Sequence, residues 1–105
     1  MKQPQPLLSI IIVSYNTREL LEQCLNSVIK SVKDIPTEII VVDNNSQDDS
    51  VEMLENLKLK TENLKLKIIV NNENLGFAKA VNQGIKKSHG DYFFLLNSDT
   101  IIFPS

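Results

Sequence analysis

Four short apolar runs, separated by stretches with helical spacing, limit the folds open to this sequence more than any other feature. The runs span residues 8–13, 38–42, 67–70 and 92–96. Their apolar residues are consecutive rather than alternate, a pattern typical of strands buried between two layers of helices. The sequence therefore predicts four strands of one sheet that is covered on both faces.

Three helices are predicted between these strands. The first starts at Thr17, a residue type that often caps helices, and ends by Pro36. The second starts at Asp48 or Asp49, and the third covers about residues 76–88. The apolar faces of the three helices consist of Leu21, Cys24, Leu25, Val28 and Val32, of Val51, Leu54 and Leu57, and of Ala78, Val81 and Ile85.

The order βαβαβαβ predicts an α/β fold class, with right-handed crossovers and a mostly parallel sheet in a three-layer α/β/α sandwich. A chain of 105 residues has the length of one domain, which we place over residues 1–105. The 11 lysines and arginines against 13 acidic residues give a net charge of -2, so no basic surface is available for nucleic acid. We expect no nucleic acid partner.

Cys24 is the only cysteine, so no disulfide can form within the chain, which favours a reducing compartment. Its place in an apolar helical stripe predicts an inert thiol in the core. The longest apolar run near the N-terminus, residues 7–13, is too short to span a bilayer. We expect a cytoplasmic location, with peripheral attachment at the inner membrane face as the alternative.

Polar residues gather where each predicted strand ends, at residues 14–16, 43–46, 71–74 and 97–99. Each group by itself is explained by turn formation, because Asn, Asp and Ser side chains hydrogen-bond to nearby backbone. In a parallel sheet, however, the carboxyl ends of the strands share one edge, where ligands of α/β proteins bind. The combination of the four groups predicts a ligand site at this edge.

The loop after the first strand excludes the usual dinucleotide site. Residues 14–20 contain no glycine, whereas that site needs a glycine-rich turn for the approach of a pyrophosphate. A divalent metal held by a carboxylate could neutralise phosphate instead. Asp99, directly after the fourth strand, is the best-placed candidate ligand; the alternative is that it only caps the strand end.

Four segments stand out in order along the chain: SIIIVSYN at residues 9–16, VVDNNSQDDS at 41–50, NENLGFAKAVNQGI at 72–85 and GDYFFLLNSDT at 90–100. They are similar to the successive motifs of family 2 glycosyltransferases with the GT-A fold. The resemblance covers residues 8–103, and four motifs in register are far more specific than one. It implies a GT-A-like sandwich in which this chain is the N-terminal part that binds a nucleotide sugar.

The resemblance also implies roles for residues in the first two motifs. Val13, Ser14 and Tyr15 match the strand end that borders the nucleotide base, with the Tyr15 ring beside a pyrimidine. Asp43 and Asn44 match an acidic pair that contacts the base or the ribose. Because the second residue of the pair is Asn here, the resemblance leaves open which of the two makes the contact.

Asn74, Gly76, Phe77 and Asn82 match the third motif, whose tight turn before the helix borders the donor site. In the fourth, Asn97 and Asp99 match the first and last residues of the DxD-type triplet, whose last aspartate binds the metal. The resemblance therefore implies Mg²⁺ or Mn²⁺ at Asp99. Asn in the first place is similar to rhamnosyltransferase-like members, and an amide there suits a hydrogen bond to ribose or sugar.

The implied reaction is the transfer of a sugar from a UDP-, dTDP- or GDP-linked donor to a hydroxyl of a saccharide or lipid-linked acceptor. The family inverts the anomeric centre, and its catalytic base lies beyond the position of Ser105, so no catalytic residue is assigned and this chain alone is expected to be inactive. The alternative is a binding module for nucleotide sugars that catalyses nothing. A receiver-like signalling domain would need an acidic pair after the first strand, which residues 14–16 do not supply.

The end of the sequence is strongly apolar and has nothing after it to cover it, as in a truncated domain. We expect self-association through this surface, because large apolar patches are rarely left open on a stable monomer. The surface comprises Tyr92, Phe93, Phe94, Ile101, Ile102 and Phe103.

Overall fold

Strands and helices alternate along the described chain. The computed structural model describes residues 6–61 and 64–101. The elements are β1 (Leu8–Ser14), α1 (Arg18–Ser31), β2 (Thr37–Asp43), α2 (Ser50–Lys60), β3 (Lys65–Val70), α3 (Phe77–Lys87) and β4 (Tyr92–Asn97). The predicted order is confirmed, although α1 ends at Ser31, several residues before Pro36.

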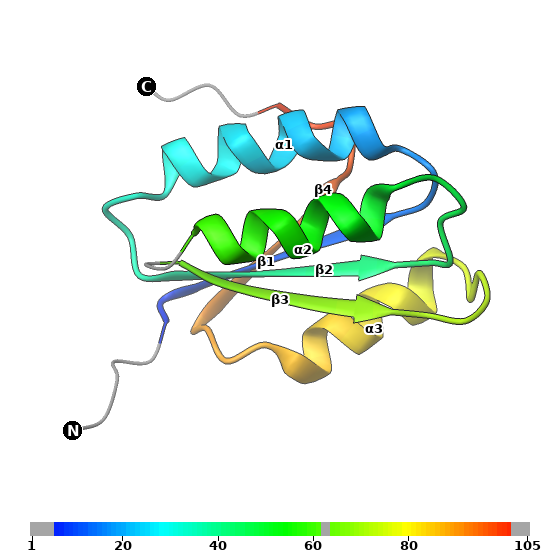
Figure 1. Ribbon diagram of the computed structural model, residues 1–105. Helices are drawn as coiled ribbons and strands as arrows, with labels where there is room; N and C mark the ends of the chain where they lie inside the picture. Colours follow the sequence, from blue (N-terminus) through cyan, green and yellow to red (C-terminus); the bar gives the residue numbers. More distant parts are fainter. Residues whose placement is uncertain (1–5, 62–63, 102–105) are drawn as a thin grey trace.

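The four strands form one parallel sheet in the order β3-β2-β1-β4. Figure 1 shows α1 and α2 on one face of the sheet and α3 on the other, so the predicted three-layer α/β/α sandwich is confirmed. The chain builds the sheet outward from β1 to β3 and then returns to place β4 on the other side of β1. This reversal puts a topological switch point at the carboxyl ends of β1 and β4.

The sheet separates two apolar cores. Ile10, Ile12, Ile39 and Val41 face α1 and α2, whereas Ile11, Ile40 and Val42 face α3. Cys24 belongs to the larger core and is fully buried, as predicted. Burial and the negative charge of the nearby Asp99 raise the pKa of its thiol to about 11, so the thiol stays protonated at neutral pH.

The inner face of α3 differs from the prediction at one position. Ala78 is exposed, and the buried residues of the helix are Ala80, Val81 and Gly84. The reason is close packing: a Cβ atom added at Gly84 would lie 2.6 Å from Cγ2 of Ile11. The helix therefore turns its smallest residues toward the sheet.

The prediction of strands covered on both faces is wrong for β4. Tyr92, Phe93 and Phe94 are 67%, 51% and 61% exposed, and Leu95 is 46% exposed. The cause is position, because β4 is an edge strand while α3 packs on β1 and β2. The expected apolar surface is thus open at Tyr92, Phe93, Phe94 and Ile101; Ile102 and Phe103 lie outside the described residues.

No helix within residues 6–61 and 64–101 combines the length and the hydropathy that a membrane span requires.

Candidate functional site

The carboxyl ends of the strands form a polar rim, as predicted. In the strand register Ser14 pairs with Asp43, and Val13 pairs with Asn97. The backbone N–H of Asn71 donates to the Asp43 carbonyl at 2.9 Å, which joins the end of β3 to that of β2. The rim therefore brings together residues from all four predicted groups.

At the end of β2, the Asp43 carboxylate orders the following turn. It is fully buried and accepts hydrogen bonds from the backbone N–H of Ser46 at 2.8 Å and from the Ser46 hydroxyl at 2.6 Å. The same hydroxyl accepts a hydrogen bond from the backbone N–H of Asn16 at 2.9 Å. Asp43 thus links the turns that follow β1 and β2.

Asn44, the second residue of the pair, is 2% exposed and points into the rim. Its Nδ2 donates to the Gly76 carbonyl at 3.1 Å, and its Oδ1 accepts from Nδ2 of Asn71 at 2.9 Å. Since neither Asp43 nor Asn44 reaches the surface, both have hydrogen-bonding roles inside the rim. Their contact with a base or a ribose stays a prediction.

Gln83 on α3 is the rim residue that sequence analysis missed. Its Nε2 donates to Oδ1 of Asn71 at 2.8 Å, and its Oε1 accepts from Nδ2 of Asn71 at 2.8 Å. Its position next to Gly84, on the inner side of α3, could have indicated this role from the sequence. A glutamine at the edge of a buried stripe needs partners there.

The turn before α3 depends on glycine. Gly76 has φ 86° and ψ 169°, a backbone conformation that is essentially restricted to glycine. Its N–H donates to Oδ1 of Asn74 at 2.9 Å, which tightens the turn. Asn74 is exposed, and Phe77 at the start of α3 is 55% exposed, so both offer surface to a ligand.

At the end of β4, the triplet of residues 97–99 is held against the start of α1. The backbone N–H of Thr100 donates to the Asn97 carbonyl at 3.0 Å and closes a turn that contains Ser98 and Asp99. The Thr17 hydroxyl donates to the Ser98 hydroxyl at 2.9 Å. Thr17 occupies the N-cap position as predicted, but its side chain holds the triplet rather than the helix end.

Asp99 presents an exposed carboxylate on the rim, beside the switch point between β1 and β4. Tyr15, at the end of β1, is 46% exposed. Within the described residues there is no cluster of three or more His, Cys, Asp or Glu side chains that could enclose a metal. One carboxylate suits a cation such as Mg²⁺, which usually takes one or two from the protein and fills its shell with water and phosphate oxygens.

Asp48, another acidic side chain of the rim, holds the turn before α2; the N-cap of that helix is Asp49, whose side chain makes no capping hydrogen bond. Its carboxylate accepts from the backbone N–H of Ser50 at 3.0 Å and from that of Arg18 at 3.2 Å. Burial raises the pKa of Asp48, but the hydrogen bonds from Ser50 and Arg18 outweigh it, so the pKa lies below its ordinary value. This carboxylate fixes the N-termini of α1 and α2 and is not a free acid or base.

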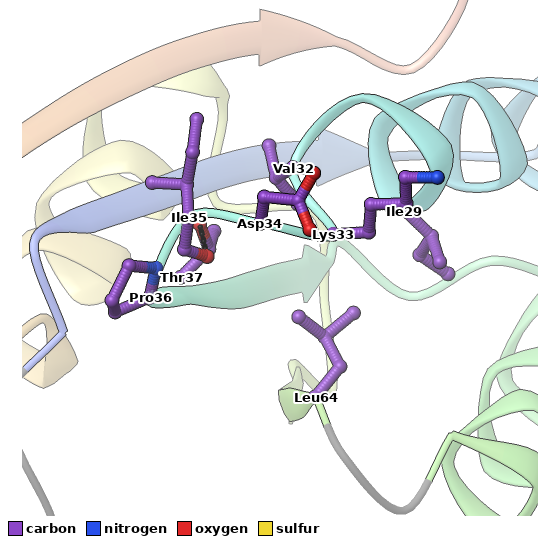
Figure 2. Close-up of a pocket in the computed structure, with 8 residues that line it drawn as sticks. All are labelled: Ile29, Val32, Lys33, Asp34, Ile35, Pro36, Thr37 and Leu64. Carbon is purple, nitrogen blue, oxygen red and sulfur yellow. Dashed lines mark hydrogen bonds between the residues drawn. The ribbon is translucent and has the colours of Figure 1, made fainter.

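A hollow of about 500 Å³ opens at the opposite edge of the sheet (Figure 2). It lies where β2 begins, and so away from the rim. Its lining is mainly apolar, and the Thr37 hydroxyl there donates to the Ile35 carbonyl at 2.8 Å. The lining residues are Ile29, Val32, Lys33, Asp34, Ile35, Pro36, Thr37 and Leu64.

Comparison with known proteins agrees with the resemblance of the motifs. The model of the family described as glycosyl transferase family 2 matches residues 9–105. The chain is 34% identical, over 95 residues, to poly-beta-1,6-N-acetyl-D-glucosamine synthase of Staphylococcus aureus, covering 90% of this chain and 22% of that protein. The chain spans between 22% and 38% of the length of the first curated relatives.

Two solved structures share the fold. TarS of S. aureus in complex with UDP is 30% identical, with a TM-score of 0.76 over 88% of this chain and 27% of that chain. A mannosyltransferase from Pyrobaculum calidifontis, solved with GDP-Man and Mn²⁺, is 24% identical with a TM-score of 0.84, over 93% of this chain and 29% of that chain. At 24% identity, the similarity to the mannosyltransferase shows a shared fold alone.

Proposed function

The chain belongs to glycosyl transferase family 2, and from this membership we propose that its rim binds the nucleoside diphosphate of a sugar donor. The single observation that carries the proposal is the exposed Asp99 carboxylate at the switch point between β1 and β4. In open parallel sheets, ligands lie outside the carboxyl ends of the strands at this point. Asp99 would therefore meet the diphosphate.

The nucleotide would lie along the exposed part of the rim. Tyr15 offers a ring, 46% exposed, for a base to pack on, and Asn97 offers an exposed amide for ribose or sugar hydroxyls. Phe77 and Asn74 border the far side of the site from the turn before α3. Val13 and Ser14 would contribute backbone, since the Ser14 side chain is buried.

A divalent metal, Mg²⁺ or Mn²⁺, would be held by Asp99 together with diphosphate oxygens. When bound, the metal would act as a Lewis acid on the leaving diphosphate. The protein's part is to fix the carboxylate: the Asn97 carbonyl and the Ser98 hydroxyl anchor the turn that carries it. A carboxylate on an anchored turn loses little conformational freedom when it binds the ion.

The donor is proposed to be linked to UDP, dTDP or GDP. UDP and GDP are the natural probes, because TarS was solved with UDP and the mannosyltransferase with GDP-Man. The acceptor is proposed to be a hydroxyl of a saccharide or of a lipid-linked molecule, since one relative is a poly-beta-1,6-N-acetyl-D-glucosamine synthase. We place the reaction in the cytoplasm or at the inner membrane face.

The transfer is proposed to invert the anomeric centre by direct displacement. This route needs a general base for the acceptor hydroxyl. The rim carboxylates with assigned partners, Asp43 and Asp48, already accept hydrogen bonds from Ser46, Ser50 and Arg18. We therefore propose that the base comes from a part of the enzyme outside these residues, and that this chain binds the donor without transferring sugar. A binding module without catalysis remains the alternative.

The test is titration calorimetry of this chain with UDP, dTDP and GDP, each with and without Mn²⁺. We expect metal-dependent binding of at least one nucleotide, and a loss of about tenfold in affinity, or about 1.4 kcal/mol, for Asp99→Asn in the presence of Mn²⁺. The matched control is Asp91→Asn, an exposed aspartate just before β4 at the opposite end of the same strand. Equal affinity with and without Mn²⁺ in the unsubstituted chain would refute the metal site.

Transfer is tested separately, with a radiolabelled donor sugar and a crude acceptor extract. This chain should bind nucleotide and transfer no sugar, whereas a relative of full length should do both. Turnover by this chain at a comparable rate would mean that the base lies among its residues. Binding with no transfer by any extended form of the protein would favour the binding module.

A further inference from the structure

Three side-chain amides form a continuous hydrogen-bonded path through the rim, from α3 to the turn before it. Gln83 and Asn71 form a reciprocal amide pair with both distances at 2.8 Å. Nδ2 of Asn71 also donates to Oδ1 of Asn44 at 2.9 Å. Nδ2 of Asn44 then donates to the carbonyl of Gly76 at 3.1 Å.

The far end of this path meets a turn whose other hydrogen bonds are local, from the Gly76 N–H to Oδ1 of Asn74 and from the Ala80 N–H to the Gly76 carbonyl. Residues 72–74 are exposed, and Leu75 is only partly buried. The N–H of Leu75 points at Oδ1 of Asn44 at 3.4 Å. Gly76, with φ 86° and ψ 169°, is in a conformation that glycine adopts without strain, so its own backbone does little to fix the turn.

Because two of the three amides are buried, the loss of any one side chain should disturb the hydrogen bonds of the others. Asn44 is 2% exposed and Asn71 is 8% exposed, so water cannot readily replace a lost partner. Losing Gln83 leaves Oδ1 of Asn71 without its donor and frees the Asn71 amide to rotate. That rotation withdraws the hydrogen bond that orients Asn44, and with it the contact to Gly76.

We propose that Asn71 and Gln83 are positioning residues that act through Asn44 to hold the turn of residues 72–76 in the shape that receives the nucleotide. The inference rests on the proposed function, in which Asn74 and Phe77 border the donor site. It assigns Asn44 a role inside the protein in place of a direct contact with base or ribose. Gln83 influences the nucleotide without touching it.

The first measurement needs no ligand. Hydrogen–deuterium exchange of the Leu75 and Gly76 amides should be about tenfold faster in Gln83→Met than in the unsubstituted chain, which corresponds to about 1.4 kcal/mol. The matched control is Gln23→Met, on the exposed face of α1. Unchanged exchange of both amides in Gln83→Met would overturn the proposal.

The second variant separates positioning from a general loss of stability. In Gln83→Glu, an ionised carboxylate would face Oδ1 of Asn71, whereas a protonated carboxyl can donate to it as the amide does. Exchange of Leu75 and Gly76, relative to the unsubstituted chain at each pH, should therefore return toward normal as the pH falls from about 7 to about 3.5, below the ordinary pKa of a glutamate at about 4.3. Acceleration that persists at low pH would contradict the proposal.

The third measurement is nucleotide affinity by calorimetry. In Gln83→Met it should be about tenfold weaker, while Gln23→Met should bind as the unsubstituted chain does. A Gln83→Met chain with faster exchange but unchanged affinity would refute the link to the nucleotide. If the unsubstituted chain binds no nucleoside diphosphate, the proposed function fails, and the exchange measurements alone decide whether the amide path holds the turn.

Discussion

Replacement of Glu38 by glutamine should destabilise the fold strongly at neutral pH. Glu38 is fully buried at the start of β2. Its Oε1 lies 2.8 Å from Nζ of Lys67, and its Oε2 accepts from the Ser9 hydroxyl at 2.6 Å and from the backbone N–H of His89. Both oxygens face donors, so either orientation of a glutamine amide would place its NH₂ group against a donor.

The size of the loss in stability depends on how well Lys67 is solvated once the Glu38 carboxylate is gone. Breaking a buried ion pair from one side typically costs about 3–5 kcal/mol. The Lys67 side chain is 30% exposed, so its ammonium recovers part of its hydration once Glu38 is gone. We therefore expect the lower end of this range, about 3 kcal/mol, for Glu38→Gln.

The loss of stability in Glu38→Gln should become smaller as the pH falls. Burial raises the pKa of Glu38, but the hydrogen bonds from Lys67, Ser9 and His89 outweigh it, so the pKa in the folded chain lies below its ordinary value of 4.5. A lowered pKa contributes stability that is present above the unfolded pKa and is lost as the pH falls through the folded one. The gap between the two chains should stay constant down to about pH 5 and then close.

Urea unfolding followed by circular dichroism at a series of pH values measures this gap. The matched control is Glu55→Gln, an exposed glutamate in the middle of α2, which should change the free energy of unfolding by less than about 0.5 kcal/mol. A Glu38→Gln loss below about 1 kcal/mol at pH 7, or a loss of equal size at pH 3, would refute the reasoning, since a salt-bridged carboxylate must lose its contribution on protonation.

Three further predictions concern the backbone at Gly76, the packing at Gly84 and self-association. Gly76→Ala should cost about 1–3 kcal/mol by urea unfolding, because no atom lies within 4 Å of the added Cβ and the cost is purely that of the backbone conformation. Gly84→Ala should cost a similar ~1–3 kcal/mol for the opposite reason, a clash with Cγ2 of Ile11 at 2.6 Å, and the same substitution should cost less in an Ile11→Ala background, which lacks that atom. Light scattering should show self-association of the unsubstituted chain at ~100 μM, and Phe94→Lys should reduce it. A monomer of the unsubstituted chain at this concentration would count against the open surface of β4 as an interface.

The sequence predicted the elements well because one physical requirement sets them. Strands such as β2, whose seven residues are all buried, need consecutive apolar side chains, and such runs are visible directly in the sequence. The same requirement made β4 look fully covered, because its apolar residues do not reveal that it lies at the edge. Hydropathy reports what a strand could bury, whereas its neighbours decide what it does bury.

Side-chain partners were harder to predict than elements. The burial of Glu38 could not be predicted from the sequence. Glutamate is rarely buried without a partner, and its partner here, Lys67, is distant in sequence. Gln83 and Asn71 likewise meet only when α3 packs on the sheet. Ala78 was assigned to the inner face of α3 from its spacing with Val81 and Ile85, which does not show that the close approach of Gly84 to Ile11 sets the face that the helix buries.

The charges of the rim bear on the proposed binding of a diphosphate, an anion, at a surface that carries acidic residues. Parallel crossovers point the N-termini of α1, α2 and α3 at the rim, and these ends carry partial positive charge. The helices α1 and α2 have acidic residues in their first turns, Glu19 and Glu52, whereas α3 has none. The uncompensated helix end therefore lies directly after the turn at Gly76.

The rim carboxylates divide in the same way. Asp43 and Asp48 are satisfied by N–H and hydroxyl donors, so their charges are spread over the turns that they hold. Asp99 is exposed and accepts no hydrogen bond from the described residues. A diphosphate would thus meet a positive helix end at α3 and, at Asp99, a charge that repels it until a cation intervenes. If the rim binds a diphosphate as proposed, metal dependence of that binding would follow from this arrangement, and it should weaken when Asp99 loses its charge.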